Sequence, residues 1–337
     1  MKPPALYGAL DEALLARAWA YLADTPAIPD EEGAPTAWPF THLPGSLDEP
    51  VLATWEVDRL RVLSNVCTHR GAVLLDAPLC ARTIRCPYHG RRFGLDGSVQ
   101  AAPGFATLPR EPLPQLRSAR LGPMLFAALA PDVELREMLA PFDARLGFLD
   151  LDAWAPDPSS ERDFTIDAHF ALWCENYLEG MHIPYVHPAL SRTLELAGYE
   201  TEVYEHGVLQ IGEAKAGEPA FELPDGHPDF GSRVAAYYVF LFPLTALNFY
   251  PWGLSLNAIQ PLGPDRTRIV YRAYVRDASL RERGAGAGLD DVEAEDDAIV
   301  ERTQRGVRSR MFRLGALSEA QEAGVRWFRE TLGSQGG

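Results

Sequence analysis

Two short segments of the chain each offer one thiol and one imidazole to a common centre. The first pairs Cys67 with His69 and the second pairs Cys86 with His89, and sixteen residues lie between His69 and Cys86. Zinc fingers usually place two cysteines in one segment and two histidines in the other. One class of [2Fe–2S] cluster takes two cysteines on one iron and two histidines on the other. Because both segments here are mixed, the pattern favours a two-iron cluster held by two loops.

A second group of potential metal ligands lies further along the chain. Glu179 and His182 are three residues apart within His169–His182, a segment of helical spacing, so we expect them on one helix face. Pro184 should end or bend that helix, which lets His187 turn back toward His182. Two histidines and one distant carboxylate form the ligand set of many non-haem Fe(II) sites. The alternative is a pair of ordinary histidines near a helix end.

Short strands are expected to position the cluster segments. Apolar and alternating runs predict strands at Val51–Val57, Leu60–Val66, Thr83–Cys86, Arg92–Leu95 and Met124–Leu129. Amphipathic spacing predicts a helix over Leu6–Leu22, and the Pro-rich, acidic residues from Thr25 to Pro39 indicate a linker. We therefore assign residues 1–37 to an N-terminal helix and linker, and 38–145 to an all-β cluster domain.

The second half of the chain has the pattern of an antiparallel sheet followed by helices. Four strands are predicted, at Val203–Ile211, Ala235–Phe242, Ala246–Ile259 and Arg268–Val275. Two late helices are predicted over Leu289–Phe312 and Ser318–Leu332, the second with a capping box from Ser318 to Gln321. The Gly-rich segment Arg281–Gly288 is expected to be mobile. The fold class is therefore α+β, with residues 146–337 as the catalytic domain.

Composition limits the classes of function. The chain has 337 residues, of which 47% are hydrophobic, and a formal net charge of -16. This charge argues against nucleic-acid binding. No apolar run is long enough to predict a membrane-spanning helix. Two of the four cysteines are assigned to the cluster and no disulfide framework is evident, so we expect a cytoplasmic protein.

Several segments resemble the Rieske non-haem iron oxygenases. CTHRG from Cys67 and CPYHG from Cys86 are similar to the family's cluster loops, and NYLEGMHIPYVH from Asn176 is similar to its mononuclear iron site. EDDAIVE from Glu295 is similar to the late helix that supplies a third iron ligand. The resemblance makes Asp296 that ligand, with Asp297 as competitor. It also implies a helix-grip, START-like catalytic domain.

The resemblance implies a terminal oxygenase component. Such a component uses O2 and electrons that a separate flavin or iron–sulfur reductase, or a ferredoxin, delivers from NAD(P)H to a [2Fe–2S] cluster and a mononuclear Fe(2+). Iron ligands are expected at His182, His187 and Asp296. By the same resemblance, Glu179 bridges the cluster of one subunit to the iron of the next in a head-to-tail homotrimer, and Asn176 belongs to the same catalytic motif.

Some segments look most like the choline- and betaine-type monooxygenase branch, namely YLEG from Tyr177 and NFYPWGLS from Asn248. Trp173, Tyr250 and Trp252 could offer aromatic faces to a quaternary amine. The reaction would then be hydroxylation or oxidative demethylation of a small substrate. The alternative is hydroxylation of an aromatic ring or O-demethylation of an aromatic acid. An arginine or lysine facing the iron would favour the aromatic acid.

Two other classes of protein remain open at this stage. A Rieske-type electron carrier with an appended domain would need neither His182 nor His187, and a zinc-stabilised binding module would be colourless. One departure from the family concerns Arg91 and Arg92, where ring-hydroxylating members usually carry Trp after the glycine. This basic pair could receive an acidic electron donor. The chain is also short for a large ring-dihydroxylating α subunit, so no β subunit is expected.

Overall fold

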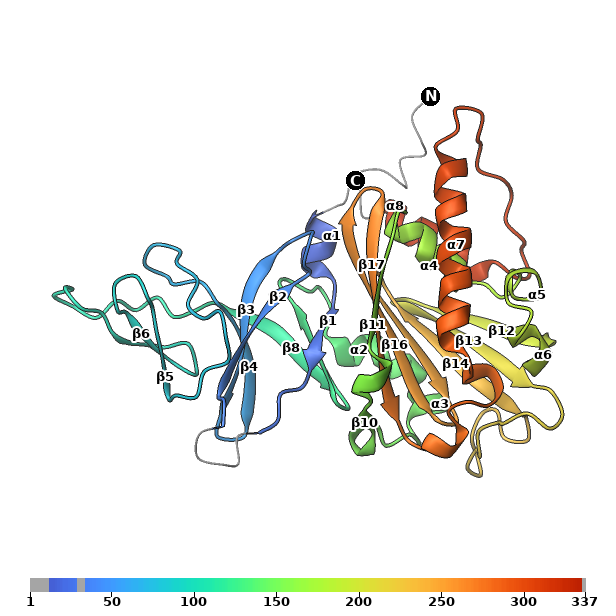
Figure 1. Cartoon of the computed structure of the whole chain (residues 1–337), viewed down its shortest axis with the longest axis horizontal. Helices are drawn as coiled ribbons and strands as arrows, with labels where there is room; N and C mark the ends of the chain where they lie inside the picture. The colour runs from blue at the N-terminus through green and yellow to red at the C-terminus, as the bar shows by residue number, and fades with distance from the viewer. Residues whose placement is uncertain (1–11, 29–33, 335–337) are drawn as a thin grey trace. The chain divides into compact units, whose positions relative to one another are not determined.

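The computed structural model describes residues 12–28 and 34–334, and it divides into two compact units (Figure 1). The first unit holds Leu15–Asp132, and the second holds the described residues up to Leu14 together with those from Val133 onward. The first unit is built almost entirely of strands, whereas the second combines a large antiparallel sheet with helices. This arrangement confirms the α+β class. No helix among the described residues combines the length and apolar character needed to cross a bilayer.

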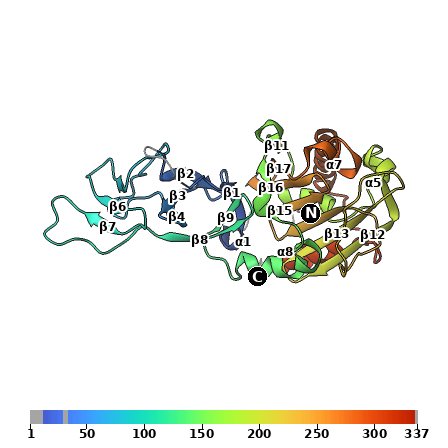
Figure 2. The same cartoon turned by 90° about the horizontal axis from the view of Figure 1, so that it is seen from below.

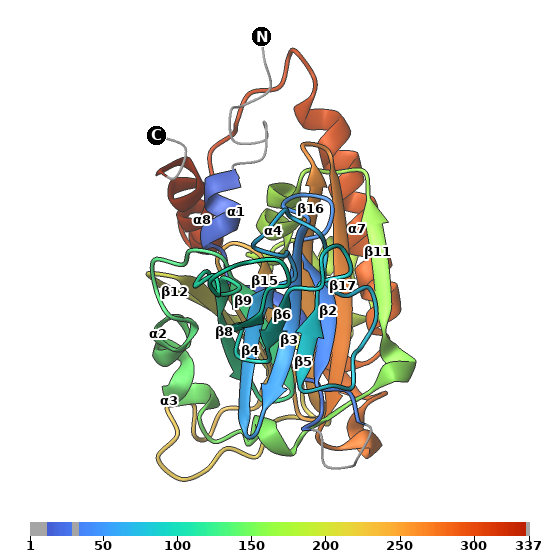
Figure 3. The same cartoon turned by 90° about the vertical axis from the view of Figure 1, so that its left-hand side faces the viewer.

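The first unit contains a six-stranded sheet and a three-stranded sheet. The large sheet has the order β1-β9-β8-β4-β3-β2, and Figure 3 shows β4, β3 and β2 side by side. Its strands are β1 (Ala20–Asp24), β2 (Ala37–His42), β3 (Glu49–Glu56), β4 (Arg59–Ser64), β8 (Gln115–Leu121) and β9 (Met124–Ala128). The small sheet contains β5 (Thr83–Arg85), β6 (Arg92–Gly94) and β7 (Val99–Ala101). The five strands predicted in this unit are therefore confirmed, with small shifts at their ends.

The predicted helix over Leu6–Leu22 is wrong in its last part. Helix α1 covers only Glu12–Arg17, and β1 follows from Ala20. Strand β1 pairs with β9, with Ala20 opposite Ala127, and this long-range pairing overrides the helical spacing of the apolar residues. Residues 6–11 lie outside the part that the structure describes. The expected linker also ends early, because β2 begins at Ala37.

The second unit is organised around an eight-stranded antiparallel sheet. Its order is β10-β17-β16-β15-β14-β13-β12, and β11 also pairs with β17. Figure 2 shows the sheet from below, with β17, β16 and β15 in succession. The strands are β10 (Ala155–Pro156), β11 (Arg162–Ile166), β12 (Leu194–Tyr204), β13 (Gly207–Ala214), β14 (Val234–Leu241), β15 (Thr245–Tyr250), β16 (Gly253–Gly263) and β17 (Arg266–Val275).

Two of the predicted strands each run through a hairpin turn. The run Val203–Ile211 crosses the turn between β12 and β13, and Ala246–Ile259 crosses the turn between β15 and β16. The second turn depends on Gly253, whose φ of 151° brings its Cα so close to Tyr274 that a Cβ would lie 2.1 Å from the carbonyl oxygen. The surrounding apolar residues hide this turn in the sequence.

Eight α-helices lie within residues 12–28 and 34–334. They are α1, α2 (Leu135–Leu139), α3 (Asp143–Leu146), α4 (Phe170–Tyr177), α5 (Ile183–Val186), α6 (Leu190–Thr193), α7 (Leu289–Val307) and α8 (Ala323–Ser334). In Figure 1, α7 runs along the sheet of the second unit, and α4 contacts both α7 and β16. The sheet, α4, α5 and α7 together carry the residues of interest.

The two late helices are shorter at one end than predicted. Helix α7 ends at Val307 instead of Phe312, and α8 begins at Ala323 instead of Ser318. Ser318 therefore does not cap α8, which begins five residues later. In the turn before the helix, Ser318 Oγ accepts a hydrogen bond from the Gln321 amide at 3.3 Å, and the Ser318 amide donates to Glu322 Oε2 at 2.6 Å. The segment Arg281–Gly288, expected to be mobile, instead buries Ala285, which is 5% exposed.

Candidate active site

The two cluster segments adopt the same backbone turn. The amide of Gly71 donates to the carbonyl oxygen of Cys67 at 3.0 Å, and the amide of Gly90 donates to that of Cys86 at 3.1 Å. Both glycines have a φ of 73°, a left-handed conformation that disfavours residues with a Cβ. In each segment the cysteine amide also bonds to the carbonyl of the residue after the glycine, at 2.8 Å. The chain thus builds one ligand-presenting loop twice.

The two loops bring all four predicted cluster ligands together. Cys67 and Cys86 are buried and lie next to one another, whereas His69 is half-buried and His89 is exposed. The two imidazole rings have centroids 4.8 Å apart. Burial raises the pKa of the Cys67 thiol, and the neighbouring Cys86 adds to this rise. Paired thiols inside and paired imidazoles outside fit the unequal ligand sets of a [2Fe–2S] cluster with mixed ligation.

The basic pair that follows the second loop divides between the interior and the surface. Arg91 is only 4% exposed, its Nη1 donates to Thr68 Oγ1 at 3.1 Å, and its guanidinium lies 5.2 Å from the Phe105 ring centroid. Arg92 is exposed. The expectation that both arginines form a docking surface is therefore wrong for Arg91, which packs beside the cluster loops.

The helix that precedes the histidines is shorter than predicted. Helix α4 ends at Tyr177 instead of continuing to His182, so Glu179 and His182 meet across a turn and do not share a helix face. Gly180 lies in this turn, and a Cβ there would approach the Tyr199 ring to 2.8 Å. Pro184 then occupies the first turn of α5, so the predicted break occurs before it.

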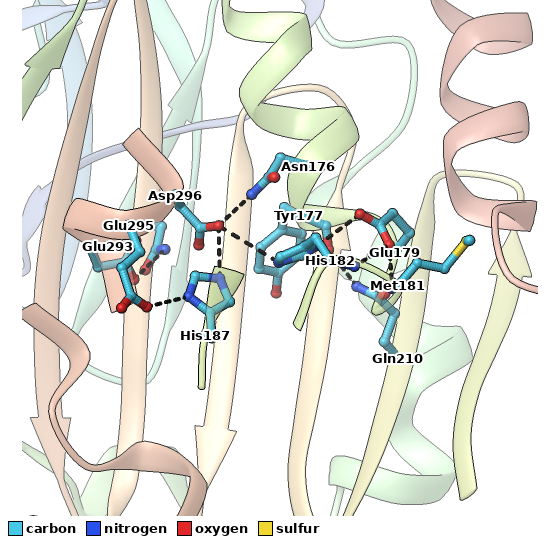
Figure 4. A network of polar contacts seen from close by, with 11 residues as sticks. Asn176, Tyr177, Glu179, Met181, His182, His187, Gln210, Glu293, Glu295 and Asp296 are labelled. Atoms are coloured by element: carbon cyan, nitrogen blue, oxygen red, sulfur yellow. Dashed lines mark hydrogen bonds and ion pairs between the residues drawn. The ribbon is translucent and has the colours of Figure 1, made fainter. Parts of the chain in front are cut away.

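Three side chains converge on one point in the second unit (Figure 4). His187 Nε2 lies 2.9 Å from Asp296 Oδ1, and His182 Nε2 lies 3.6 Å from the same oxygen. One ligand atom from each of the three residues falls within 4.8 Å of the others. Two imidazole nitrogens and one carboxylate at this spacing fit an Fe(II) ion. The structure brings Asp296, and not Asp297, to the histidines.

Neighbouring polar groups orient these three side chains. Glu179 Oε1 lies 2.7 Å from His182 Nδ1, and Glu295 Oε2 lies 2.7 Å from His187 Nδ1. Asn176 Nδ2 donates to Asp296 Oδ1 at 2.6 Å. With both Nδ1 atoms engaged by carboxylates, the Nε2 atoms are the ones left for a metal, an arrangement common around protein metal sites.

Burial and the neighbouring carboxylates shift the pKa values of two side chains at this site. Burial lowers the pKa of His187, but hydrogen bonds and charges from Asp296 and Glu295 outweigh burial and leave the pKa raised. Burial raises the pKa of Asp297 to about 7, with the Asp296 charge adding to the effect. Asp297 Oδ1 is buried and has no hydrogen-bond partner among the described residues.

A cavity opens beside the three converging side chains. Its aromatic walls are formed by Trp173, Tyr177, Tyr199, Tyr238 and Tyr250. Among the described residues that line it, none is lysine or arginine. Trp252 is not part of the lining and stacks on the ring of Tyr250 with centroids 5.5 Å apart. Of the three predicted substrate residues, Trp173 and Tyr250 therefore face the cavity.

Sequence reasoning missed the polar part of this cavity. Gln210, Asn248 and Asn257 each stand within an apolar strand, and Glu293 lies on α7. Asn248 Oδ1 accepts a hydrogen bond from the Tyr177 hydroxyl at 2.7 Å, and its Nδ2 donates to Asn257 Oδ1 at 3.2 Å. The available signal was a polar residue at an otherwise apolar strand position, because a buried polar side chain needs hydrogen-bond partners and is therefore informative.

Two family descriptions match the two units. A Rieske [2Fe-2S] domain matches residues 45–115, and "Ring hydroxylating alpha subunit (catalytic domain)" matches residues 151–335. These families bind a [2Fe–2S] cluster and a mononuclear iron, respectively. The first match contains both cluster loops, and the second contains His182, His187 and Asp296.

Curated relatives include chloroplastic choline monooxygenases. The Arabidopsis thaliana enzyme is 30% identical over 301 residues, which cover 82% of this chain and 68% of that protein. The Beta vulgaris enzyme is 28% identical, and the chain spans 64% of its length. The carnitine monooxygenase oxygenase subunit of Escherichia coli strain K12 is 29% identical over 75% of this chain and 70% of that protein.

Solved structures share the fold over nearly the whole chain. The quaternary ammonium Rieske monooxygenase CntA, in complex with an inhibitor, superimposes with a TM-score of 0.74 at 20% identity, covering 99% of this chain and 94% of that one. Naphthalene 1,2-dioxygenase from Rhodococcus sp. gives a TM-score of 0.68 at 17% identity, covering 96% and 90%. Because the catalytic-domain match alone covers more than half of the residues, the chain belongs to the ring-hydroxylating alpha subunit family of Rieske oxygenases.

Proposed function

We propose that this protein is the terminal oxygenase component of a Rieske oxygenase system acting on a small organic amine. One observation carries the proposal: the group His182, His187 and Asp296 opens into an aromatic-walled cavity whose described lining contains no lysine or arginine. Aromatic faces attract an ammonium group, each contributing about 0.5–2 kcal/mol. An aromatic carboxylate would lack a basic partner in this lining, so hydroxylation or O-demethylation of an aromatic acid is the weaker alternative.

The proposed ligand assignment follows the two units. Cys67, His69, Cys86 and His89 would hold the cluster, and His182, His187 and Asp296 would hold the iron. When bound, these groups supply one-electron transfer and dioxygen activation. With two electrons and two protons, one oxygen atom enters a substrate C–H bond and the other leaves as water. If the hydroxylated carbon is attached to nitrogen, the product breaks down to an aldehyde and a dealkylated amine.

The chain's own residues would bind and orient the reactants. Trp173 and Tyr250 line the cavity and are at most 4% exposed, so they exclude water from the bound ammonium group. Glu179 and Glu295 hold the two histidines through their Nδ1 atoms. Asn176 holds the Asp296 carboxylate. Each of these contacts fixes a ligand before iron binds, which reduces the cost of ordering.

The wider assembly is part of the same proposal. Electrons would come from NAD(P)H through a flavin or iron–sulfur reductase or a ferredoxin, and Glu179 would link the subunits of a homotrimer. The solved structure of one quaternary ammonium Rieske monooxygenase gives insights into inter-subunit electron transfer in that protein. We also propose a cytoplasmic location, a helix-grip (START-like) catalytic domain, and domain boundaries after residues 37 and 145. All four cysteines are free thiols, which supports that location.

A substrate screen tests this function. The purified holoprotein is combined with a surrogate reductase and offered amines (choline, glycine betaine, carnitine and putrescine) or aromatic acids (benzoate, vanillate and phenylpropionate). Substrate-dependent dioxygen use and product mass are measured, with His187→Ala as the iron-free control. We expect coupled turnover with at least one amine and none with His187→Ala. Coupled turnover confined to the aromatic acids would contradict the proposal.

A further inference from the structure

Glu293 is a buried carboxyl group in the wall of the active-site cavity. It lies on α7 three residues before Asp296, so both side chains project from the same side of the helix. Glu293 is 8% exposed, and its Oε1 accepts a hydrogen bond from Asn257 Nδ2 at 3.3 Å. A carboxyl group at this depth is rarely found without a charged partner or a function.

The three carboxyl groups of the cavity lining differ in what they contact. Glu179 contacts His182, and Asp296 contacts both histidines and Asn176. Glu293 accepts its hydrogen bond from the neutral Asn257, and no lysine or arginine is among the described residues of this lining. Glu293 is therefore the carboxyl group of this lining that contacts neither histidine. Glu293 also borders a second cavity, whose lining includes Arg162, Arg272 and Arg281.

The electrostatic environment of Glu293 suits a cation. Burial raises the pKa of Glu293 to about 8, and the charge of Asp296 adds to this rise. An organic cation in the cavity reverses that balance, because an opposite charge within a few ångströms favours the ionised carboxylate. Tyr250, which lines the same cavity, feels the charge of Glu293, so an acid and an aromatic face border the same space.

A second buried group indicates what else the ligand carries. Gln210 is 1% exposed and lines the cavity, and its Nε2 donates to the Tyr177 carbonyl oxygen at 2.7 Å. Its Oε1 has no hydrogen-bond partner among the described residues. A buried acceptor of this kind needs a donor, which a hydroxyl or an N–H group supplies and a carboxylate does not.

We propose that Glu293 is the counter-ion of the substrate, and that the substrate is a small organic cation without a carboxylate, such as an amino alcohol or a diamine. The inference rests on the proposed function and narrows its substrate class. A betaine or carnitine would bring a carboxylate into a lining that offers two carboxyl groups near the iron ligands and no basic side chain among its described residues. Such like-charge contacts reject a ligand as effectively as missing attractive contacts.

The test compares the affinities of the iron-loaded holoenzyme for four amines by isothermal titration calorimetry. Choline and putrescine lack a carboxylate, whereas glycine betaine and carnitine carry one. Glu293→Gln removes the carboxyl charge at nearly constant volume. Asp291→Asn, two residues earlier on the exposed side of α7, removes the same charge from the same helix and serves as the matched control. Iron content and melting temperature are recorded for each variant.

We expect wild-type protein to bind choline or putrescine at least about tenfold more tightly than either carboxylated amine, and Glu293→Gln to lose most of that preference. Asp291→Asn should bind like wild type. Equal affinity of Glu293→Gln and wild type for choline and putrescine would overturn the inference. If Glu293→Gln does not fold or hold iron, the wild-type preference decides alone, and tighter binding of the carboxylated amines overturns it.

Measurements of substrate turnover distinguish a failure of this inference from a failure of the proposed function. Coupled oxidation of carnitine or glycine betaine, without oxidation of choline or putrescine, would leave an amine oxygenase and overturn the role of Glu293. Coupled oxidation of aromatic acids alone would overturn both.

Discussion

The cluster loops and the iron site bring their ligands together in opposite ways. Each cluster loop presents its cysteine and histidine from one five-residue turn, and the same turn occurs at Cys67 and Cys86. The iron site takes two histidines from the region around α5 and a carboxylate from α7, so residues 182 and 296 must be brought together by the whole sheet. The first site is therefore a local structure, whereas the second depends on long-range packing.

The surroundings of the two sites also have opposite charge. A buried arginine, Arg91, packs beside the cluster loops. The iron site is surrounded by Glu179, Glu293 and Glu295, and the described residues of its cavity lining include no lysine or arginine. A positive neighbour suits a cluster that gains negative charge on reduction, and an acidic cavity suits an organic cation. The contrast suggests that each unit is matched to its own step of the reaction.

The largest effect is expected from a substitution that destroys the cluster site and leaves the iron site intact. Cys86→Ser should abolish the visible absorption and the reduced EPR signal of the cluster, because a serine hydroxyl is a poor substitute for a thiolate. The mononuclear iron should stay, since its ligands lie in the other unit. An unchanged cluster spectrum in Cys86→Ser would contradict the ligand assignment.

Glu179→Ala should separate metal binding from turnover. Both metal sites should remain filled, but turnover with the natural donor should fall by about 100-fold or more, because His182 loses the carboxylate that orients its Nδ1. Metal analysis and steady-state oxygen uptake measure the two effects. Full turnover would remove Glu179 from the proposed electron route, and loss of iron would make it a structural residue.

The long-range site can be tested on two adjacent acids. Asp296→Asn should weaken iron binding by about 10–100-fold, whereas Asp297→Asn should bind iron almost as wild type does. Only Asp296 contacts both histidines in the structure. Competition with a chelator gives the two affinities. The reverse order would make Asp297 the ligand, which was the alternative that the sequence left open.

The smallest expected effect concerns the charge beside the cluster. Arg91→Gln should lower the reduction potential, because it removes a buried positive charge that favours the more negative, reduced cluster. Arg92→Gln, at the exposed neighbouring position, is the matched control and should leave the potential nearly unchanged. An EPR-monitored redox titration compares them, and equal shifts in both variants would contradict a special role for Arg91.

The same contrast explains how much could be predicted from the sequence. The cluster loops and their strands were predictable because the ligands lie within residues 67–89 and short turns determine the geometry. The helix ending at Tyr177 was not, because its end depends on Gly180 approaching the ring of Tyr199 on β12. The choice between Asp296 and Asp297 needed the helix phase of α7. A one-residue rotation would exchange which carboxylate faces the histidines.

The cavity was predictable only in its aromatic part. Aromatic residues near the iron motif were expected, and Trp173 and Tyr250 do line the cavity. Glu293 and Gln210 come together only through the pairing of strands and the docking of α7, which no local pattern records. The hidden turns at Glu205 and Pro251 show the same limit, because an apolar run does not mark where a buried hairpin reverses.

The central claim is that one chain holds two separate iron sites, and iron and acid-labile sulfide per chain measure this most directly. We predict about three irons and two sulfides in the wild-type protein. His187→Ala should retain about two irons and two sulfides, which are those of the cluster. Cys86→Ser should retain about one iron, the mononuclear one, and no sulfide. Wild-type protein with two irons and two sulfides, unchanged in His187→Ala, would contradict the claim and indicate a pure electron carrier.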